Sequence, residues 1–352
     1  MIAWRIPLLS RFRRVTPRLP PRSGPSINLF ANLETDWILN TIAEAIVRES
    51  TVPYNPVHHP EWERLKREPP FRDAAANLFI HYALYRDYLR RNAPGADIVF
   101  FTHFWPMSSV PAAAEAERLE VLATLRQARL IVSMSSHWKR RLVDWGIPEG
   151  KISVQVVGSD ASKFTPGARP ASERPVAGMV SSFKDNKNSA FIRDLVLHHV
   201  GLDWVLLGRN WERSTLLDDL AAARNFRYLD MSKTDFGRWP EIYRGFDLFV
   251  SPSTTEGGPV PLLEAMLTGV WPIATDTGHA SDVIRPGESG FLFPPNDLEA
   301  FGLRLQESLS LFKERSEAVR RSALPWSWER FGRGMDALIA NNILLDSPTE
   351  KT

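Results

Sequence analysis

The chain has 352 residues, which is enough for two domains of ordinary size, each with its own hydrophobic core. Its 43 basic and 41 acidic residues leave a net charge of +2, so we expect no nucleic-acid partner, which would need a strongly basic surface. The absence of cysteine excludes disulfides and thiolate chemistry, and no apolar run approaches the roughly 18 residues that span a bilayer.

Residues 1–23 are interpreted as a basic N-terminal tail. Between residues 4 and 22 the chain has six arginines and no acid, interleaved with apolar side chains. Such a segment can lie on an anionic membrane surface, and it lacks the long apolar core of a secretory signal. We therefore expect a cytoplasmic protein that can associate peripherally with the inner membrane surface. A loose tail without a membrane role is the alternative and is slightly favoured. Pro17, Pro20 and Pro21 prevent a long helix in this stretch.

Strands and helices alternate from residue 24 to 166, which predicts a first Rossmann-like domain with a parallel sheet. Residues 50–72 contain five prolines and are expected to form an irregular loop. This loop contains two adjacent histidines, His58 and His59, which are weak evidence for a metal site. We expect strands at 27–33, 97–101, 130–134 and 152–157, and helices at about 37–48, 115–127 and 136–145.

A histidine follows the expected strand at 97–101. Parallel α/β sheets bind ligands at the carboxyl ends of their strands, so His103 lies where a ligand is expected. The alternative is a histidine that packs beside Trp105 and makes only local hydrogen bonds, since histidine is intermediate in burial.

A second Rossmann-like domain is expected at 176–325, after a linker rich in proline and polar residues. Residues 326–345 carry an apolar stripe at helical spacing and are expected to form a C-terminal helix. The strands expected in this half are 176–181, 204–207, 226–229, 247–251 and 270–274, and a short helix is expected at 239–245.

The strand at 247–251 leads through a glycine-containing loop into a helix that stops at Gly269. Unpaired N–H groups and the positive end of the helix dipole make such a helix start suitable for a phosphate. Gly257 and Gly258 carry no side chain to block a ligand. Pro259 has no N–H, so Val260 is the expected backbone donor.

Two carboxylates bracket this anion site, Glu256 in the loop and Glu264 in the helix, with seven residues between them. A carboxylate accepts two hydrogen bonds side by side and therefore matches two neighbouring sugar hydroxyls. One acid on each side of a pyrophosphate fits a nucleotide sugar. Taken singly, either residue could be an ordinary surface glutamate, but their joint placement around the glycines favours binding.

The stretch from Asp247 to Pro295 resembles the signature of the retaining glycosyltransferases of family four, which have the GT-B fold. The chain departs from it at Pro259, where many members have glycine, and at Asp282, where glutamate is usual. The resemblance is carried by Pro-Ser after the strand, Glu-Gly, the second glutamate, Glu-Ala-Met, Thr275-Asp276 with Gly278, then Gly287, Gly290 and the ending FLFPP.

The resemblance implies an α/β protein of two facing Rossmann-like domains, with the C-terminal helix crossing back to the first. From the sequence alone, that helix could equally pack on its own domain. The first domain would take the acceptor and the second the nucleotide sugar. The glycine-rich loop that members commonly have after the first strand is missing at residues 32–36.

The resemblance also implies roles for single residues. A histidine near a strand end of the first domain faces the donor sugar, and His103 is the best match. An arginine and, five residues later, a lysine grip the phosphates. Lys187 matches the lysine, whereas Ser182 stands at the arginine position, where Lys184 or Arg209 could substitute. The alternative for Lys187 is a solvated lysine in a turn.

The expected function is metal-independent transfer of a sugar, with retained configuration, from a nucleotide sugar to a hydroxyl of a glycan, lipid-linked or other acceptor. The nucleotide sugar is a co-substrate, and no cofactor or metal site is expected. The alternative is a catalytically weak or inactive nucleotide-sugar-binding homologue acting as a partner subunit. The candidate residues are His103 and Glu256 for catalysis, and Lys187, Gly257, Gly258, Val260 and Glu264 for donor binding.

Overall fold

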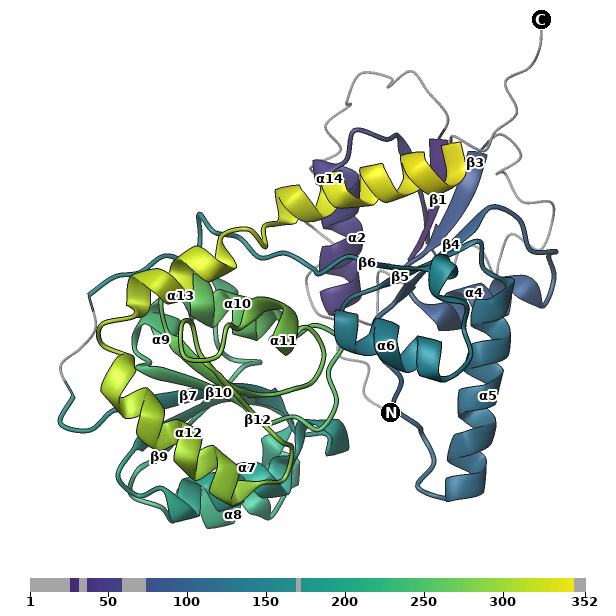
Figure 1. Cartoon of the computed structure of the whole chain (residues 1–352). Helices are drawn as coiled ribbons and strands as arrows, with labels where there is room; N and C mark the ends of the chain where they lie inside the picture. The colour runs from purple at the N-terminus through teal and green to yellow at the C-terminus, as the bar shows by residue number, and fades with distance from the viewer. Residues whose placement is uncertain (1–25, 32–36, 59–73, 169–171, 345–352) are drawn as a thin grey trace, which may run out of the picture.

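The computed structural model describes residues 26–31, 37–58, 74–168 and 172–344. In this part of the chain, two parallel six-stranded sheets with their helices lie side by side (Figure 1). The basic tail at 1–23, His59 and the loop at 32–36 lie outside the described residues. The two sheets correspond to the two halves of the sequence.

The first sheet has the strand order β2-β1-β3-β4-β5-β6 and every neighbouring pair is parallel. Alternate residues of its strands enter two different hydrophobic cores, so both faces of the sheet are covered. Its strands are β1 (Ser26–Ala31), β2 (Tyr54–His58), β3 (Ala74–Phe79), β4 (Asp97–Phe101), β5 (Leu130–Ser133) and β6 (Ile152–Val154), and its helices are α2 (Trp37–Glu49), α4 (Tyr82–Leu89), α5 (Pro111–Gln127) and α6 (Ser136–Asp144).

The expectation of an irregular loop over residues 50–72 is wrong for Tyr54–His58, which pair in parallel with β1 at the edge of the sheet. Pro56 fits there because an edge strand needs its N–H groups on one side only. No strand or helix was predicted from the sequence between residues 74 and 96, where β3 and α4 lie. Asn77 interrupts the apolar pattern of β3, and its side chain donates a hydrogen bond to Asp97 at 2.9 Å.

The second sheet has the order β12-β11-β10-β7-β8-β9, also parallel throughout. The chain passes from β9 to β10 on the other side of β7, so the order reverses between β7 and β10. Its strands are β7 (Val176–Ser182), β8 (Asp203–Arg209), β9 (Phe226–Asp230), β10 (Leu248–Ser251), β11 (Trp271–Thr275) and β12 (Phe291–Phe293), and its helices are α7 (Ser189–His198), α8 (Leu216–Ala221), α9 (Trp239–Arg244), α10 (Val260–Leu267), α11 (Ala280–Val283), α12 (Leu298–Leu311) and α13 (Ser316–Ala323).

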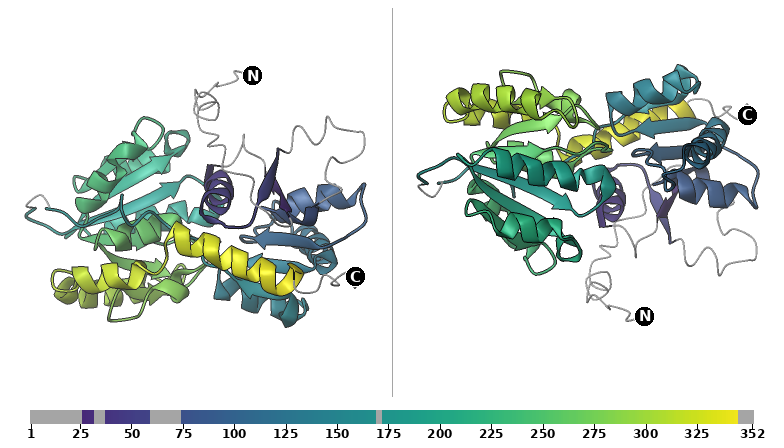
Figure 2. Two further views of the ribbon diagram at one scale, coloured as in Figure 1. Left: turned by 90° about the horizontal axis from the view of Figure 1, so that it is seen from above. Right: turned by 90° about the horizontal axis from the view of Figure 1, so that it is seen from below.

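The C-terminal helix α14 (Trp328–Ile339) passes from the second sheet to the first and packs across α2 (Figure 1 and Figure 2). Phe331, Met335 and Ile339 are buried in the core of the first sheet. The Asp336 carboxylate accepts a hydrogen bond at 2.8 Å from the Thr51 hydroxyl. Of the two placements that the sequence left open for this helix, the crossing one is therefore correct.

Among the described helices, none has both the length and the apolar character required to pass through a bilayer.

Candidate active site

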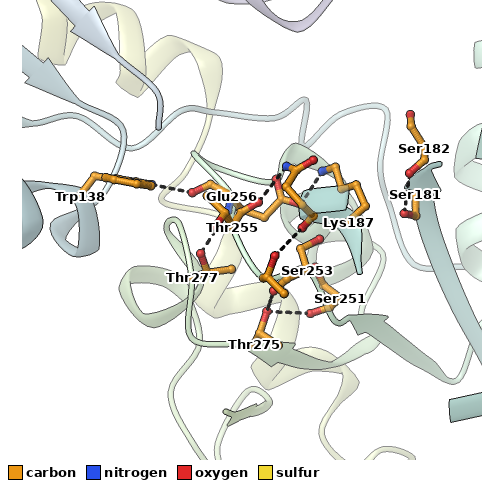
Figure 3. Close-up of polar contacts among 12 residues, drawn as sticks. Trp138, Ser181, Ser182, Lys187, Ser251, Ser253, Thr255, Glu256, Thr275 and Thr277 are labelled. Carbon is orange, nitrogen blue, oxygen red and sulfur yellow. Dashed lines mark hydrogen bonds and ion pairs between the residues drawn. The ribbon is translucent and has the colours of Figure 1, made fainter. Parts of the chain in front are cut away.

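The candidate site lies where the strand order of the second sheet reverses. Open α/β sheets bind ligands in the crevice outside the carboxyl ends of the two strands at such a point. Here those ends carry the turn after β7 and the loop 252–259 after β10 (Figure 3). Several hydrogen bonds join them, among them those from the Thr254 N–H to the Asn186 carbonyl at 3.0 Å and from the Asn186 side chain to the Thr255 carbonyl at 3.1 Å.

Lys187 and Glu256 form an ion pair across this junction (Figure 3). Lys187 ends a short 3-10 turn, Asp185–Lys187, that follows β7, and Glu256 belongs to the loop after β10. Burial raises the pKa of Glu256, but the charge and hydrogen bond of Lys187, helped by Ser253, outweigh it, so the pKa is lowered. Glu256 is therefore a carboxylate at neutral pH.

The backbone of Glu256 is held on both sides (Figure 3). Its N–H donates to the Thr277 hydroxyl at 3.1 Å, and its carbonyl accepts from the Trp138 indole at 2.7 Å. Trp138 belongs to α6 of the first sheet, so this hydrogen bond joins the two halves of the molecule. A second one runs from the Ser136 N–H at the start of α6 to the Asp282 carboxylate at 3.0 Å.

The loop glycines pack closely against the first half of the chain. A Cβ atom on Gly257 would lie 2.9 Å from the carbonyl oxygen of Thr102, which follows β4. A Cβ on Gly258 would lie 2.6 Å from the His279 ring and 2.8 Å from the Met134 side chain. A side chain at Gly257 would press on the Thr102 backbone, so this glycine is required for the contact with the first half of the chain.

His103 lies beside the loop, immediately after Thr102. Its charge contributes to lowering the pKa of Glu256, and it also lowers the pKa of His81. His81 follows β3 and caps α4 by accepting from the Ala83 N–H at 3.2 Å. Burial first, then His103, lowers the pKa of His81 to about 4. The structure thus brings His103, Glu256 and Lys187 together.

The sequence reasoning missed His81. The available signal was the same as for His103, a histidine just after a strand, but β3 itself was not predicted.

Glu264 occupies a separate environment inside α10. Only 3% of the residue is exposed, and its carboxylate accepts a hydrogen bond from the Tyr243 hydroxyl at 2.7 Å. Burial raises the pKa of Glu264 to about 7, although Tyr243 and the charge of Lys163 act in the opposite direction. This residue therefore carries a proton in a large fraction of molecules at neutral pH.

Val260, the expected backbone donor, is the first residue of α10. Its side chain packs into the core of the first sheet, together with Met134 and Val157. The Pro259 carbonyl accepts from the Leu262 N–H at 2.9 Å, which is the first turn of the helix. The helix start is thereby fixed against the first half of the molecule.

In the stretches 26–31, 37–58, 74–168 and 172–344, no three histidine, aspartate or glutamate side chains are grouped so that they could hold a metal ion.

Two facing parallel sheets with a helix crossing between them define the GT-B fold, as expected. The structure is similar to that of sucrose-phosphate synthase from Thermosynechococcus elongatus, with a TM-score of 0.75 and 15% identity. The similarity covers 92% of this chain and 100% of that one. It is also similar to Alr3699/HepE of Anabaena, solved in complex with UDP and glucose, with a TM-score of 0.69 and 11% identity over 90% of this chain and 100% of the other. These similarities confirm the predicted fold.

Residues 169–323, which include β7 to α13, match the family model described as "Glycosyl transferases group 1". The chain is 28% identical over 213 residues to WcaL of Salmonella typhimurium, which is assigned as a colanic acid biosynthesis glycosyltransferase. That alignment covers 55% of this chain and 51% of WcaL. The chain thus spans about half the length of the first relatives that it matches.

Proposed function

We propose that the protein is a glycosyltransferase that moves a sugar from a nucleotide sugar to a hydroxyl group of an acceptor. The observation that carries this proposal is the Lys187–Glu256 ion pair, which joins the turn after β7 to the loop after β10 at the crevice between these two strands. The match to the glycosyltransferase family model over this same region supports it.

Each of these residues has a part of the donor to hold. Lys187 binds the diphosphate and stabilises the negative charge that grows on it as the bond to the sugar breaks. Glu256 accepts hydrogen bonds from hydroxyls of the transferred sugar. Glu264, further into the helix, holds the ribose. The backbone N–H of Val260 and the glycines Gly257 and Gly258 let the phosphates approach the loop.

Without a donor, Lys187 and Glu256 neutralise one another. Donor binding replaces this ion pair with two new contacts, Lys187 to phosphate and Glu256 to sugar hydroxyls. The ion pair therefore keeps the buried carboxylate of Glu256 and the half-buried ammonium of Lys187 paired until the ligand arrives.

In the reaction, the bond between the anomeric carbon and the diphosphate oxygen breaks, and the acceptor oxygen bonds to that carbon while its proton leaves. We propose retained configuration and no metal ion, with His103 facing the donor sugar. We propose no covalent intermediate and therefore no double displacement.

The acceptor is a glycan or a lipid-linked glycan in this proposal, since WcaL is named for colanic acid biosynthesis. Peripheral membrane contact through the tail at 1–23 would bring the enzyme to a lipid-linked acceptor. Deletion of residues 1–22 would show whether the tail contributes to vesicle binding.

The alternative, an inactive partner subunit, rests on Ser182 at the position of the expected arginine. A panel of nucleotide sugars tests both functions. Thermal shifts identify the donor, and release of the nucleoside diphosphate in the presence of acceptor measures turnover. Stabilisation by one donor with turnover supports the enzyme. If a donor stabilises the protein but is neither transferred nor slowly hydrolysed, the partner subunit is favoured. If no nucleotide sugar stabilises the protein, both proposed functions are contradicted.

A further inference from the structure

Strand β7, which leads to the turn that carries Lys187, ends with an uncharged residue, Ser182. Strand β8 runs parallel beside β7, and in the register of the two strands Arg209 is the partner of Ser182. Arg209 is the last residue of β8. An arginine on the neighbouring strand therefore lies at the same carboxyl edge, next to the position that lacks a cation.

The end of β8 is fastened to the turn after β7. The Phe183 N–H donates to the Arg209 carbonyl at 2.8 Å, and the Trp211 indole donates to the Ser181 carbonyl at 2.9 Å. The rings of Phe183 and Trp211 pack edge to face with centroids 5.4 Å apart. These contacts hold the backbone of Arg209 in place beside the segment that leads to Lys187.

The guanidinium group of Arg209 has unused hydrogen-bonding capacity. Its Nε atom is shielded from water and has no hydrogen-bond partner among the described residues. A buried donor without a partner is costly, so the guanidinium group gains by turning towards a ligand that supplies an acceptor. A guanidinium also matches two phosphate oxygens at once, which a lysine cannot do.

We propose that Arg209 is the second cation for the diphosphate of the nucleotide sugar, in place of the arginine that Ser182 replaces. This inference rests on the proposed function. Lys184, the other nearby cation, is exposed and precedes the 3-10 turn, so it is the weaker candidate. With Arg209 on one side and Lys187 on the other, the diphosphate is held from two neighbouring strand ends.

Calorimetry with UDP, GDP and ADP, and with the matching nucleosides, tests this inference. For the diphosphate that the natural protein binds, Arg209→Gln should weaken binding by about 10- to 100-fold, because one charged hydrogen-bonding partner is lost. Binding of the bare nucleoside should change by less than about twofold. Adding Ser182→Arg to Arg209→Gln should restore much of the diphosphate affinity, which a merely structural defect would not allow.

Two matched variants serve as controls. Arg227→Gln changes an exposed arginine of β9, away from the strand end, and Lys184→Gln removes the competing cation. Neither should alter diphosphate affinity. If Arg209→Gln folds poorly, Arg209→Lys takes its place and should lose affinity for the diphosphate but not for the nucleoside.

Unchanged diphosphate affinity in the Arg209 variants would overturn the inference and leave the proposed function standing, as would a loss seen only in Lys184→Gln. If the natural protein binds none of the three diphosphates, the proposed function fails first, and the role of Arg209 fails with it.

Discussion

Glu256 and Glu264 are the same residue type in one short stretch, yet their pKa values move in opposite directions. Burial raises both pKa values. Lys187 outweighs it for Glu256 with a direct ion pair, whereas Glu264 has only the neutral Tyr243 hydroxyl in hydrogen-bond contact and the charge of Lys163 nearby. The spacing of the two glutamates in the sequence predicts the positions of the acids. Their protonation states depend on partners that are distant in the sequence, Lys187 and Tyr243.

The raised pKa of Glu264 predicts how stability depends on pH. The folded protein keeps this proton up to a pH of about 7, whereas an unfolded glutamate loses it near its ordinary pKa of 4.5. Between these values the folded state binds more protons than the unfolded state, so the free energy of unfolding falls as pH rises. Over this range the contribution lost is on the order of 3 kcal/mol.

Glu264→Gln keeps the shape of the side chain but does not titrate. Denaturant unfolding of both proteins at pH 4.5 to 7.5 gives the difference in stability, which should move in favour of the variant as pH increases. A difference that stays constant with pH would show that Glu264 does not titrate in this range.

His103 is expected to contact the donor sugar and not the nucleotide. His103→Ala should therefore lower turnover by about 10- to 100-fold, the range of a lost catalytic contact, and leave affinity for the nucleoside diphosphate nearly unchanged. His198→Ala, at the exposed end of α7, is the matched control. If His103→Ala is as active as the parent, the histidine only packs locally.

At the level of elements, five of the six strands of the second sheet were predicted from the sequence, and β12 (Phe291–Phe293) was not. The apolar runs of these five strands are short and bounded by breakers, and the sheet is buried on both faces. The prediction failed for β2 and β3, where Pro56 and Asn77 interrupt the pattern. Such residues are tolerated only because of their place in the sheet, Pro56 at an edge and Asn77 bonded to Asp97 of the next strand. That information comes from tertiary structure.

The crossing helix depends on a glycine at its contact with α2. A Cβ on Gly332 would lie 2.5 Å from the Cβ of Glu49 and 3.0 Å from its backbone carbon, so Gly332→Ala should overpack the contact and cost about 1 to 3 kcal/mol. Gly302→Ala in α12 is the control, because its Cβ would meet only the His199 ring, at 3.8 Å.

Glycine to alanine in a helix normally stabilises by up to about 1 kcal/mol, and the control should show this gain. Chemical denaturation of both variants measures the difference. Equal gains in both would mean that α14 does not pack closely on α2.

At the scale of the whole molecule, the site is built from both halves. Trp138 and Thr102 of the first half contact the loop of the second at Glu256 and Gly257. The resemblance in sequence indicated two facing domains, and the similar structures confirm that fold. These contacts join residues that are more than 100 positions apart in the sequence; Trp138 and Glu256 are 118 positions apart. No local sequence pattern predicts them.

Calorimetry of three alanine variants against a nucleoside, its diphosphate and the nucleotide sugar tests the donor site most directly. Losing one hydrogen bond to a charged group should weaken binding by roughly 10- to 150-fold. Lys187→Ala should weaken the diphosphate far more than the nucleoside. Glu264→Ala should weaken the diphosphate and the nucleotide sugar alike. Glu256→Ala should spare the diphosphate, since it frees Lys187, and impair transfer. Equal affinity of all three variants for every ligand would contradict the donor site and the proposed glycosyltransferase.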